Sequence, residues 1–149
     1  MAVNPNTDFS AGNVLTAAQQ NRFPRGVVAE NSTTTTYTTT NSYVDVLACS
    51  SFTAVTNRLY QVTFTSSSAG YATAGSRIAV KLLRNSSIIT IGYQGTNATG
   101  VVLEVTGLFV ATGATVVKAQ AKYDIGSSSD LYADVNSPMR LWVEDLGPY

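Results

Sequence analysis

The sequence feature that most constrains the fold is a strict alternation of apolar and polar residues. In YQVTFT, residues 60–65, and in VKAQAKY, residues 117–123, every second side chain is apolar. A half-buried β-strand needs this period of two, because successive side chains point to opposite faces of a sheet. The alternation therefore predicts strands that each turn one face toward a core.

Eight segments carry strand patterns, and no helical pattern lies between them. We predict strands over residues 27–29, 43–47, 60–65, 77–84, 88–93, 101–110, 115–123 and 140–146. A turn at residues 84–87 should join two of them into a hairpin, and Gly107 should mark a bend or bulge. Short strands at regular spacing favour an antiparallel sandwich, a jelly roll or a barrel, and periodicity does not choose among these.

The intervening segments are rich in Ser, Thr and Gly. Residues 66–76, 94–100 and 124–130 have the composition of turns and loops. The tract NSTTTTYTTTNS, residues 31–42, predicts a solvated strand or an edge loop, because the branched Cβ of threonine favours an extended backbone.

Length and charge narrow the class of protein. The 149 residues suit a single domain, and nine Lys and Arg balance nine Asp and Glu. Because the cations are scattered along the sequence and no apolar run reaches the roughly 18 residues of a membrane span, we expect neither nucleic-acid binding nor membrane insertion. The amino end carries no secretory signal, which predicts synthesis in a cytoplasm without export. A charged fraction of only 12% favours a protein packed against neighbours.

Side chains suited to catalysis are scarce. The chain has no histidine, which removes the commonest general base and metal ligand. Its one cysteine, Cys49, fits a small buried hydrophobe better than a nucleophile. Asp124 and Asp130 fit turn formers around a Gly-Ser loop better than calcium ligands. Glu144 and Asp145 fit the solvated end of a strand. We therefore expect no enzymatic activity, no metal and no cofactor.

Residues 1–26 differ from the rest of the chain and predict a docking arm with a short helix. Thr16 can cap the helix, Gln19 completes a capping box, and Pro24 ends it. A helix this short is not stable alone, so it must pack on the domain's own core or on a second chain, and we favour the second chain. The guanidinium groups of Arg22 and Arg25 suit a partner that bears carboxylates. The predicted docking residues are Phe9, Val14, Leu15, Arg22, Phe23, Pro24 and Arg25.

Three segments resemble a class of small virion proteins of tailed bacteriophages, particularly those that infect actinobacteria. FSAGNVLTAAQQNRFPRG, residues 9–26, is similar to their opening Phe-x-x-Gly-x-Val-Leu-Thr-Ala-Ala segment with its following Asn and Pro-Arg-Gly. SSFTAVTNRLYQVTF, residues 50–64, is similar to their Phe-Thr-Ala-x-x-Asn-Arg-x-Tyr strand entry. LWVEDLGPY, residues 141–149, looks like their Val-Glu-Asp-x-Gly-Pro ending.

The resemblance implies a non-enzymatic virion protein, assembled in the host cytoplasm and located at the tail or tail tip. It implies a single antiparallel, jelly-roll-like β-sandwich over residues 27–149, anchored by the arm of residues 1–26, that forms a homotrimer and contacts other virion proteins. The alternatives are a capsid decoration protein of the same fold and a glycan-binding module. For the latter, Trp142 would be the sugar platform, although its place in RLWVEDL favours packing at a strand end. Candidate aromatics for contact with a host surface glycan are Tyr37, Tyr71, Tyr93 and Tyr132.

Overall fold

The computed structural model describes residues 23–71, 76–95, 101–126 and 128–149, which form β-strands and loops and, within these ranges, no helix. The strands are β1 (Gly26–Thr33), β2 (Tyr37–Thr38), β3 (Val44–Ala48), β4 (Phe52–Ala54), β5 (Arg58–Tyr71), β6 (Arg77–Arg84), β7 (Ser87–Gly95), β8 (Val101–Val110), β9 (Gly113–Thr115), β10 (Val117–Ile125), β11 (Ser129–Tyr132) and β12 (Met139–Pro148).

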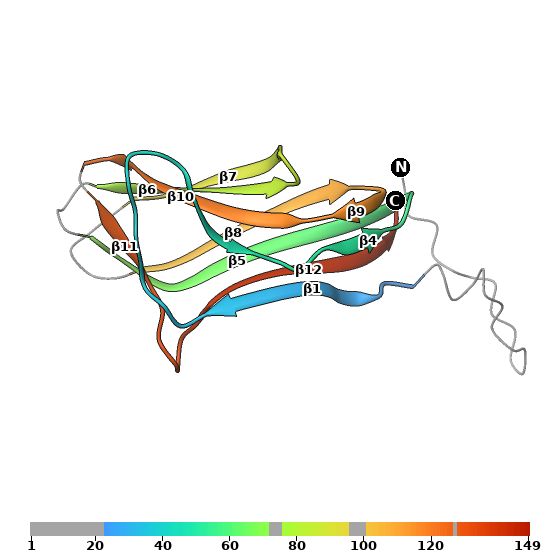
Figure 1. Ribbon diagram of the computed structural model, residues 1–149, viewed down its shortest axis with the longest axis horizontal. Helices are drawn as coiled ribbons and strands as arrows, with labels where there is room; N and C mark the ends of the chain where they lie inside the picture. Colours follow the sequence, from blue (N-terminus) through green and yellow to red (C-terminus); the bar gives the residue numbers. More distant parts are fainter. Residues whose placement is uncertain (1–22, 72–75, 96–100, 127) are drawn as a thin grey trace, which may run out of the picture.

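Each strand pairs with the strand that mirrors it in chain order. β1 pairs with β12, β2 with β11, β3 with β10, β4 with β9, β5 with β8 and β6 with β7, all antiparallel. The chain is therefore one long hairpin with its tip between β6 and β7. The two halves of this hairpin fold over together (Figure 1). Pairings of β5 with β12 and β11, and of β6 with β10, close the sheets.

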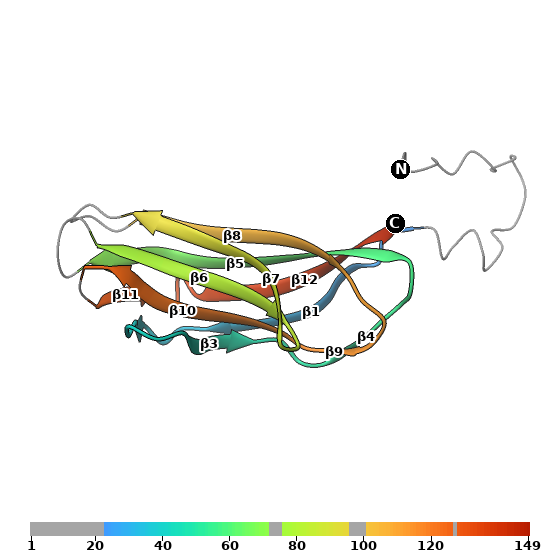
Figure 2. The same ribbon diagram turned by 90° about the horizontal axis from the view of Figure 1, so that it is seen from above.

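Two main sheets lie face to face in a sandwich-like arrangement (Figure 2). The β5 sheet has the order β1-β12-β5-β11-β2, and β8 pairs with the remaining edge of β5. The β6 sheet has the order β3-β10-β6-β7, and β4 with β9 forms a small two-stranded sheet beside them. All of these pairings are antiparallel, as the regular spacing of short strands without helices between them predicts.

The core lies between the two sheets and consists of the inward-pointing members of each alternation. The side chains of Tyr60, Val62, Phe64, Leu141 and Val143 enter it from the β5 sheet, and those of Ile78, Val80 and Leu82 from the β6 sheet; each is at most 1% exposed. Full burial of one such side chain is worth about 1.5–3 kcal/mol. Packing of these residues is therefore the main source of stability.

Two glycines let β7 approach β8 where the sheets meet. A Cβ on Gly92 would lie 2.5 Å from Val105 Cγ2, and one on Gly107 would lie 2.7 Å from Ile89 Cγ2. The pairing of β8 with β5 continues without a shift through Gly107, opposite Val62. The predicted bulge at Gly107 is therefore wrong, because the glycine serves close packing between strands instead.

The predicted strands all fall on observed ones, but some loops were assigned incorrectly. β5 continues through Ser66 to Tyr71, and β11 includes Ser129 and Asp130, although both segments had been predicted as turns. The threonine tract is mostly exposed and contains the end of β1 and the short β2, as expected for a solvated edge. Thr39 is the exception: it is 1% exposed, and its Oγ1 donates to the Ser129 carbonyl at 2.7 Å. The predicted helix lies outside the described residues.

Candidate functional site

The most distinctive polar feature of the molecule is a buried ion pair between β5 and β12. Arg58 Nε donates to Asp145 Oδ2 at 2.6 Å, and the two side chains are 4% and 1% exposed. Removing charges from water is costly, so a buried pair persists only where further hydrogen bonds satisfy its remaining donors and acceptors. Asp145 Oδ1 accepts such a bond from the Gly147 amide at 2.8 Å.

The same ion pair holds the chain where the N-terminal arm joins the sandwich. Arg58 Nη2 donates to the Phe23 carbonyl at 2.5 Å, and the Arg25 amide donates to the Asp145 carbonyl at 3.2 Å. We call the cluster of Phe23, Arg25, Arg58 and Asp145 the arm root. Hydrogen bonds thus tie the first residue of β5 and a residue near the end of β12 to two residues of the arm.

Local backbone geometry explains why the two charged side chains meet. β5 begins directly after Asn57, whose φ of 62° lies in the left-handed region that asparagine tolerates better than most residues. The pairing of β12 with β5 shifts between Asp145 and Gly147, and Gly147 has a φ of 105°. Asp145 precedes this shift and continues the alternation of the buried residues Leu141 and Val143. It therefore lies on the buried side of β12, rather than at the solvated strand end that the sequence predicted.

The predicted docking residues fall partly on the arm root. Phe23, Pro24 and Arg25 are exposed at the start of the described chain, and Phe23 is 40% exposed. The predictions for Phe9, Val14, Leu15 and Arg22 lie outside the described residues. Arg58 and Asp145 were not predicted as site residues. The signal available was their presence in two of the three segments used for the resemblance, 50–64 and 141–149.

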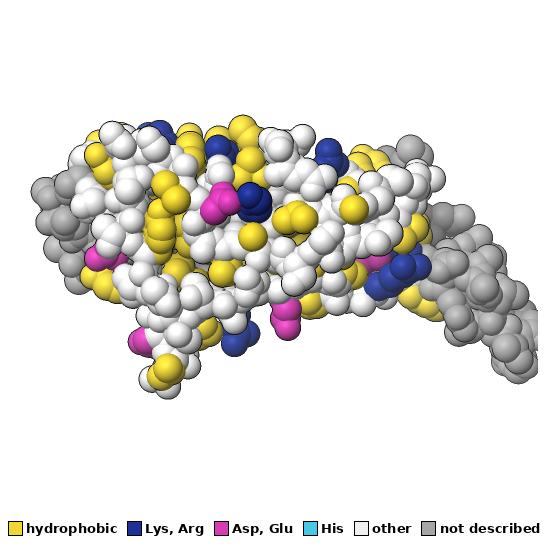
Figure 3. Space-filling model, viewed as in Figure 1, with side chains coloured by type: hydrophobic (Ala, Val, Ile, Leu, Met, Phe, Trp, Pro, Cys, Tyr) yellow, Lys and Arg dark blue, Asp and Glu magenta, His cyan; other side chains and the backbone are white. Residues whose placement is uncertain are grey.

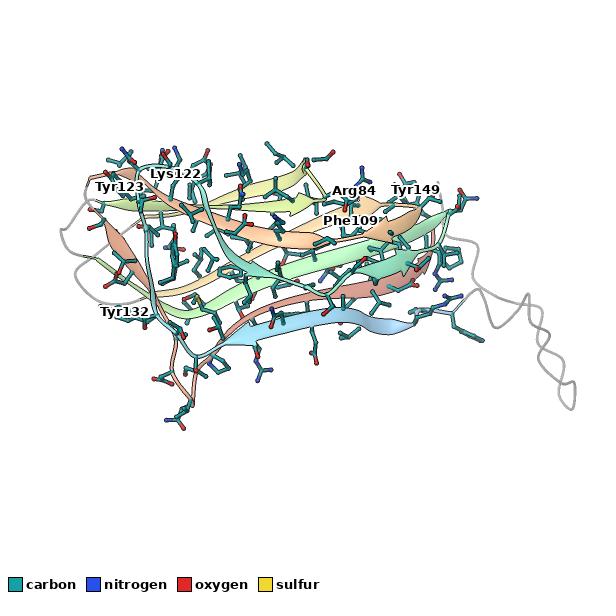
Figure 4. The ribbon with its side chains drawn as sticks, viewed as in Figure 1. Arg84, Phe109, Lys122, Tyr123, Tyr132 and Tyr149 are labelled. Carbon is teal, nitrogen blue, oxygen red and sulfur yellow. The ribbon has the colours of Figure 1, made fainter. Side chains whose placement is uncertain are left out.

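The four candidate tyrosines do not form one patch. Tyr93, on β7, is 53% exposed, and its ring centroid lies 4.8 Å from Arg77 Cζ. Tyr132, at the end of β11, is 43% exposed. Figure 4 shows it below the upper edge of the molecule, where the β10 residues Lys122 and Tyr123 lie. Tyr37 is half-buried against the core, and burial raises the pKa of its phenol. Tyr71 ends β5, and its side chain is outside those described.

Trp142 lines a hollow on the outer face of the β5 sheet. It lies between the buried residues Leu141 and Val143, so its side chain points away from the core, opposite Thr63 on β5 and Glu30 on β1. Trp142 is half-buried on this outer face and lies within β12 rather than at the end of the strand, where the sequence placed its packing role. The hollow has a volume of about 630 Å³ and is lined by Val27, Glu30, Asn31, Ser32, Thr65, Arg140, Leu141 and Trp142.

The cysteine and the carboxylate considered in the sequence analysis are buried or ion-paired. Cys49 is buried, its Sγ lies 3.4 Å from the Leu141 carbonyl, and burial raises the pKa of its thiol to about 11. Asp124 accepts hydrogen bonds from Arg77 and Lys122, in that order of effect, and these lower the pKa of its carboxyl. Across the described ranges, no group of three or more potential metal ligands comes together.

The comparisons with family models and with curated proteins assign this chain to no family. No protein-family model matches the chain, and no curated protein does. Within the part of the chain that the structure describes, no helix has the length and apolar character needed to cross a membrane.

Proposed function

We propose that this chain is a non-enzymatic structural protein of a bacteriophage particle, anchored by its N-terminal arm. The observation that carries the proposal is the arm root. Burying an ion pair is costly, and here Arg58 also donates from Nη2 to the backbone carbonyl of Phe23, which lies outside the strands. This contact holds the backbone of Phe23, the first described residue, against the sandwich, which suits the base of a docking arm.

The positions of the three phage-like segments support the same proposal. Residues 24–26, 57–58 and 145–148 are far apart in sequence, yet Gly26 pairs with Asp145, and Arg58 pairs with Pro148. The described end of the first segment and parts of the other two thus meet at one end of the sandwich. Their common purpose, in this proposal, is to build the base of the arm.

We further propose a jelly-roll topology and a homotrimer. The nested pairs β1 with β12, β3 with β10, β5 with β8 and β6 with β7 support the first, because a long hairpin rolled into two sheets produces this order. The trimer follows from the resemblance and is tested by sedimentation equilibrium of the full chain. A monomer or dimer at every concentration would contradict it.

The position in the particle separates a tail-tip appendage from a capsid decoration protein. Immunogold electron microscopy with antibody against the chain should place gold at the tail or its tip. Gold over the head would favour the decoration protein, and unlabelled particles would refute the virion assignment. We favour the tail because the phage proteins that the chain resembles include longer appendage proteins with a similar opening segment.

The arm itself is tested by substitution within the full chain. Leu15→Ser with Phe9→Ser should leave the urea midpoint unchanged, since both residues precede the described sandwich, while incorporation into particles falls. Val135→Ser is a matched control, because Val135 is 81% exposed on a distant loop. A lowered midpoint for the arm variant would show that these residues belong to the domain's own core.

Carbohydrate binding is a second candidate function, favoured by one observation. The indole of Trp142 lines a hollow together with the polar side chains of Glu30, Ser32 and Arg140, and an aromatic face with a few convergent polar groups is the usual pattern of a ligand site. Titration of host cell-wall polysaccharide should then quench Trp142 fluorescence. An unchanged spectrum would exclude binding at this hollow.

A further inference from the structure

The charged side chains are sorted between the two outer faces of the sandwich. The three glutamates of the chain, Glu30, Glu104 and Glu144, all lie on the outer face of the β5 sheet, which we call the acidic face. Their positions follow from the register, since Glu30 lies opposite Trp142, Glu104 opposite Thr65 and Glu144 opposite Gln61. Asp130 on β11, opposite Gly70 of β5, points outward from the same sheet, because it alternates with the buried Ser129 and Leu131. Among the described residues of these strands, Arg140 is the only cation at an outward position, so the acidic face carries a balance of −3.

The three lysines lie on the opposite side of the molecule. Lys81 on β6 and Lys118 and Lys122 on β10 point outward from the β6 sheet, because they alternate with the buried residues Val80, Ala119 and Ala121. We call this the basic face. Figure 3 shows Lys and Arg side chains along the upper edge of the molecule, and both acidic side chains and a basic one at the lower edge.

The basic face also holds Arg77 and two carboxylates, Asp45 and Asp124. Lys118 pairs with Asp45 at 2.8 Å and Lys122 with Asp124 at 3.1 Å, and Arg77 also contacts Asp124. Lys81 instead lies 4.0 Å from the centroid of the Tyr43 ring. Four cations against two carboxylates leave a balance of +2, and the net charge of zero for the chain therefore conceals two oppositely charged faces.

The glutamates of the acidic face have no cationic partner within the described part of the chain. Among the described residues, Glu30, Glu104 and Glu144 take part in no ion pair, whereas both carboxylates of the basic face do. Exposed Val102 and Leu108 lie on the same outer face. Carboxylates and apolar side chains together suit a partner that offers cations and aromatic rings, which is what Lys81, Tyr43 and Tyr93 provide.

We propose that a second copy of this chain binds by laying its basic face on the acidic face of the first. The charge balances of the two faces are opposite in sign, and both faces belong to the same chain, so charge complementarity identifies a second copy as the partner. Such a contact is heterologous, because the two copies use different surfaces, and repeated copies close into a ring or extend as a stack. The inference goes beyond the proposed function and does not depend on it, since the contact requires no other virion protein.

The contact would cover Trp142, which lies among the glutamates of the acidic face. Self-association and carbohydrate binding at the hollow are therefore competing uses of one surface. Because Trp142 is the only tryptophan, its fluorescence reports on this face without a label. Association should shift its emission to shorter wavelength.

The test uses the full chain and two charge-reversed variants. Lys81→Glu with Lys122→Glu makes both faces acidic, and Glu30→Lys with Glu104→Lys makes both faces basic. Each variant alone should raise the dissociation constant by at least about tenfold, because like charges across a contact cost more than the ~1.4 kcal/mol that a tenfold change represents. An equimolar mixture of the two should associate again, because acidic faces then meet basic ones.

Sedimentation velocity and Trp142 emission are recorded at about 0.1 M and 1 M salt, where the screening length is about 10 Å and about 3 Å respectively. The wild type should associate at low salt and dissociate at high salt. Ser86→Lys, in the exposed turn between β6 and β7 and outside both faces, is the control and should behave as the wild type. The single variants Lys81→Glu and Glu30→Lys should show the same effects more weakly, in case a double variant fails to fold.

Three results would overturn the proposal. The wild type could remain a monomer at low salt, in which case another chain occupies these faces. Association could persist unchanged in either reversed variant, which would place the interface elsewhere. The mixture could fail to associate although each variant is folded by circular dichroism, which would exclude pairing of the acidic with the basic face.

Discussion

Replacing Asp145 by asparagine tests the arm root most directly. The substitution preserves side-chain volume and the oxygen that accepts the Gly147 amide, but it removes the charge opposite Arg58. The guanidinium is 4% exposed, so it would remain buried without a counter-charge. Breaking a buried pair in this way costs about 3–5 kcal/mol. With a urea dependence of roughly 2 kcal/mol per molar, the midpoint should fall by about 2 M.

The assay is urea unfolding followed by circular dichroism and Trp142 fluorescence. Asp45→Asn provides a matched control, because it removes the same charge from an ion pair whose side chains are 37% and 47% exposed, where the expected loss is below about 1 kcal/mol. Arg58→Met combined with Asp145→Asn should cost less than the sum of the two single changes, since no buried charge is left unpaired. Equal midpoint shifts for Asp145→Asn and Asp45→Asn would refute the reasoning.

Three further predictions concern packing, reactivity and pH. Gly92→Ala places a Cβ 2.5 Å from Val105 Cγ2 and should cost about 1–3 kcal/mol in urea unfolding, whereas Gly95→Ala, with nothing within 4 Å, should cost less; equal costs would contradict the close packing. Cys49, with its pKa raised to about 11, should resist a thiol reagent at pH 8 in the folded protein and react at once in urea; rapid labelling of the folded chain would show that the thiol is accessible. The hydrogen bonds from Arg77 and Lys122 lower the pKa of the Asp124 carboxyl. Its contribution to stability is therefore present above the unfolded pKa of 3.8 and is lost as the pH falls through the lowered folded pKa. Asp124→Asn should flatten the acid side of the curve of stability against pH, and an unchanged acid side would contradict this.

The strands could be predicted because alternation is a local property of the sequence. In β12, Leu141 and Val143 are buried while Trp142 points outward, and this pattern is visible without knowing any neighbour. The short strands β4 and β9 were missed because three residues do not establish a period. The end of β5 was missed because its Ser and Gly residues are extended by pairing with β11, which local propensity does not reveal.

The candidate site could not be predicted because it depends on pairings between distant segments. Arg58 and Asp145 are separated by 87 positions in the sequence, and alternation alone does not tell which strands are neighbours. The same limit applies to the charged faces. Lys81 and Lys118 can be assigned to outward positions from the period of two, but that they share a sheet follows only from the pairing of β10 with β6.

The nested pairing has a consequence for the order in which the chain folds during synthesis. β12 lies between β1 and β5, so the β5 sheet has a gap at its centre until residues 139–148 have emerged from the ribosome. The hairpin of β6 and β7 needs only a two-residue turn and can form early. Long-range pairs close slowly because the loop entropy must be overcome first. The nascent chain therefore spends its translation time without its main core, and the arm root, which needs both Phe23 and Asp145, is among the last features to form.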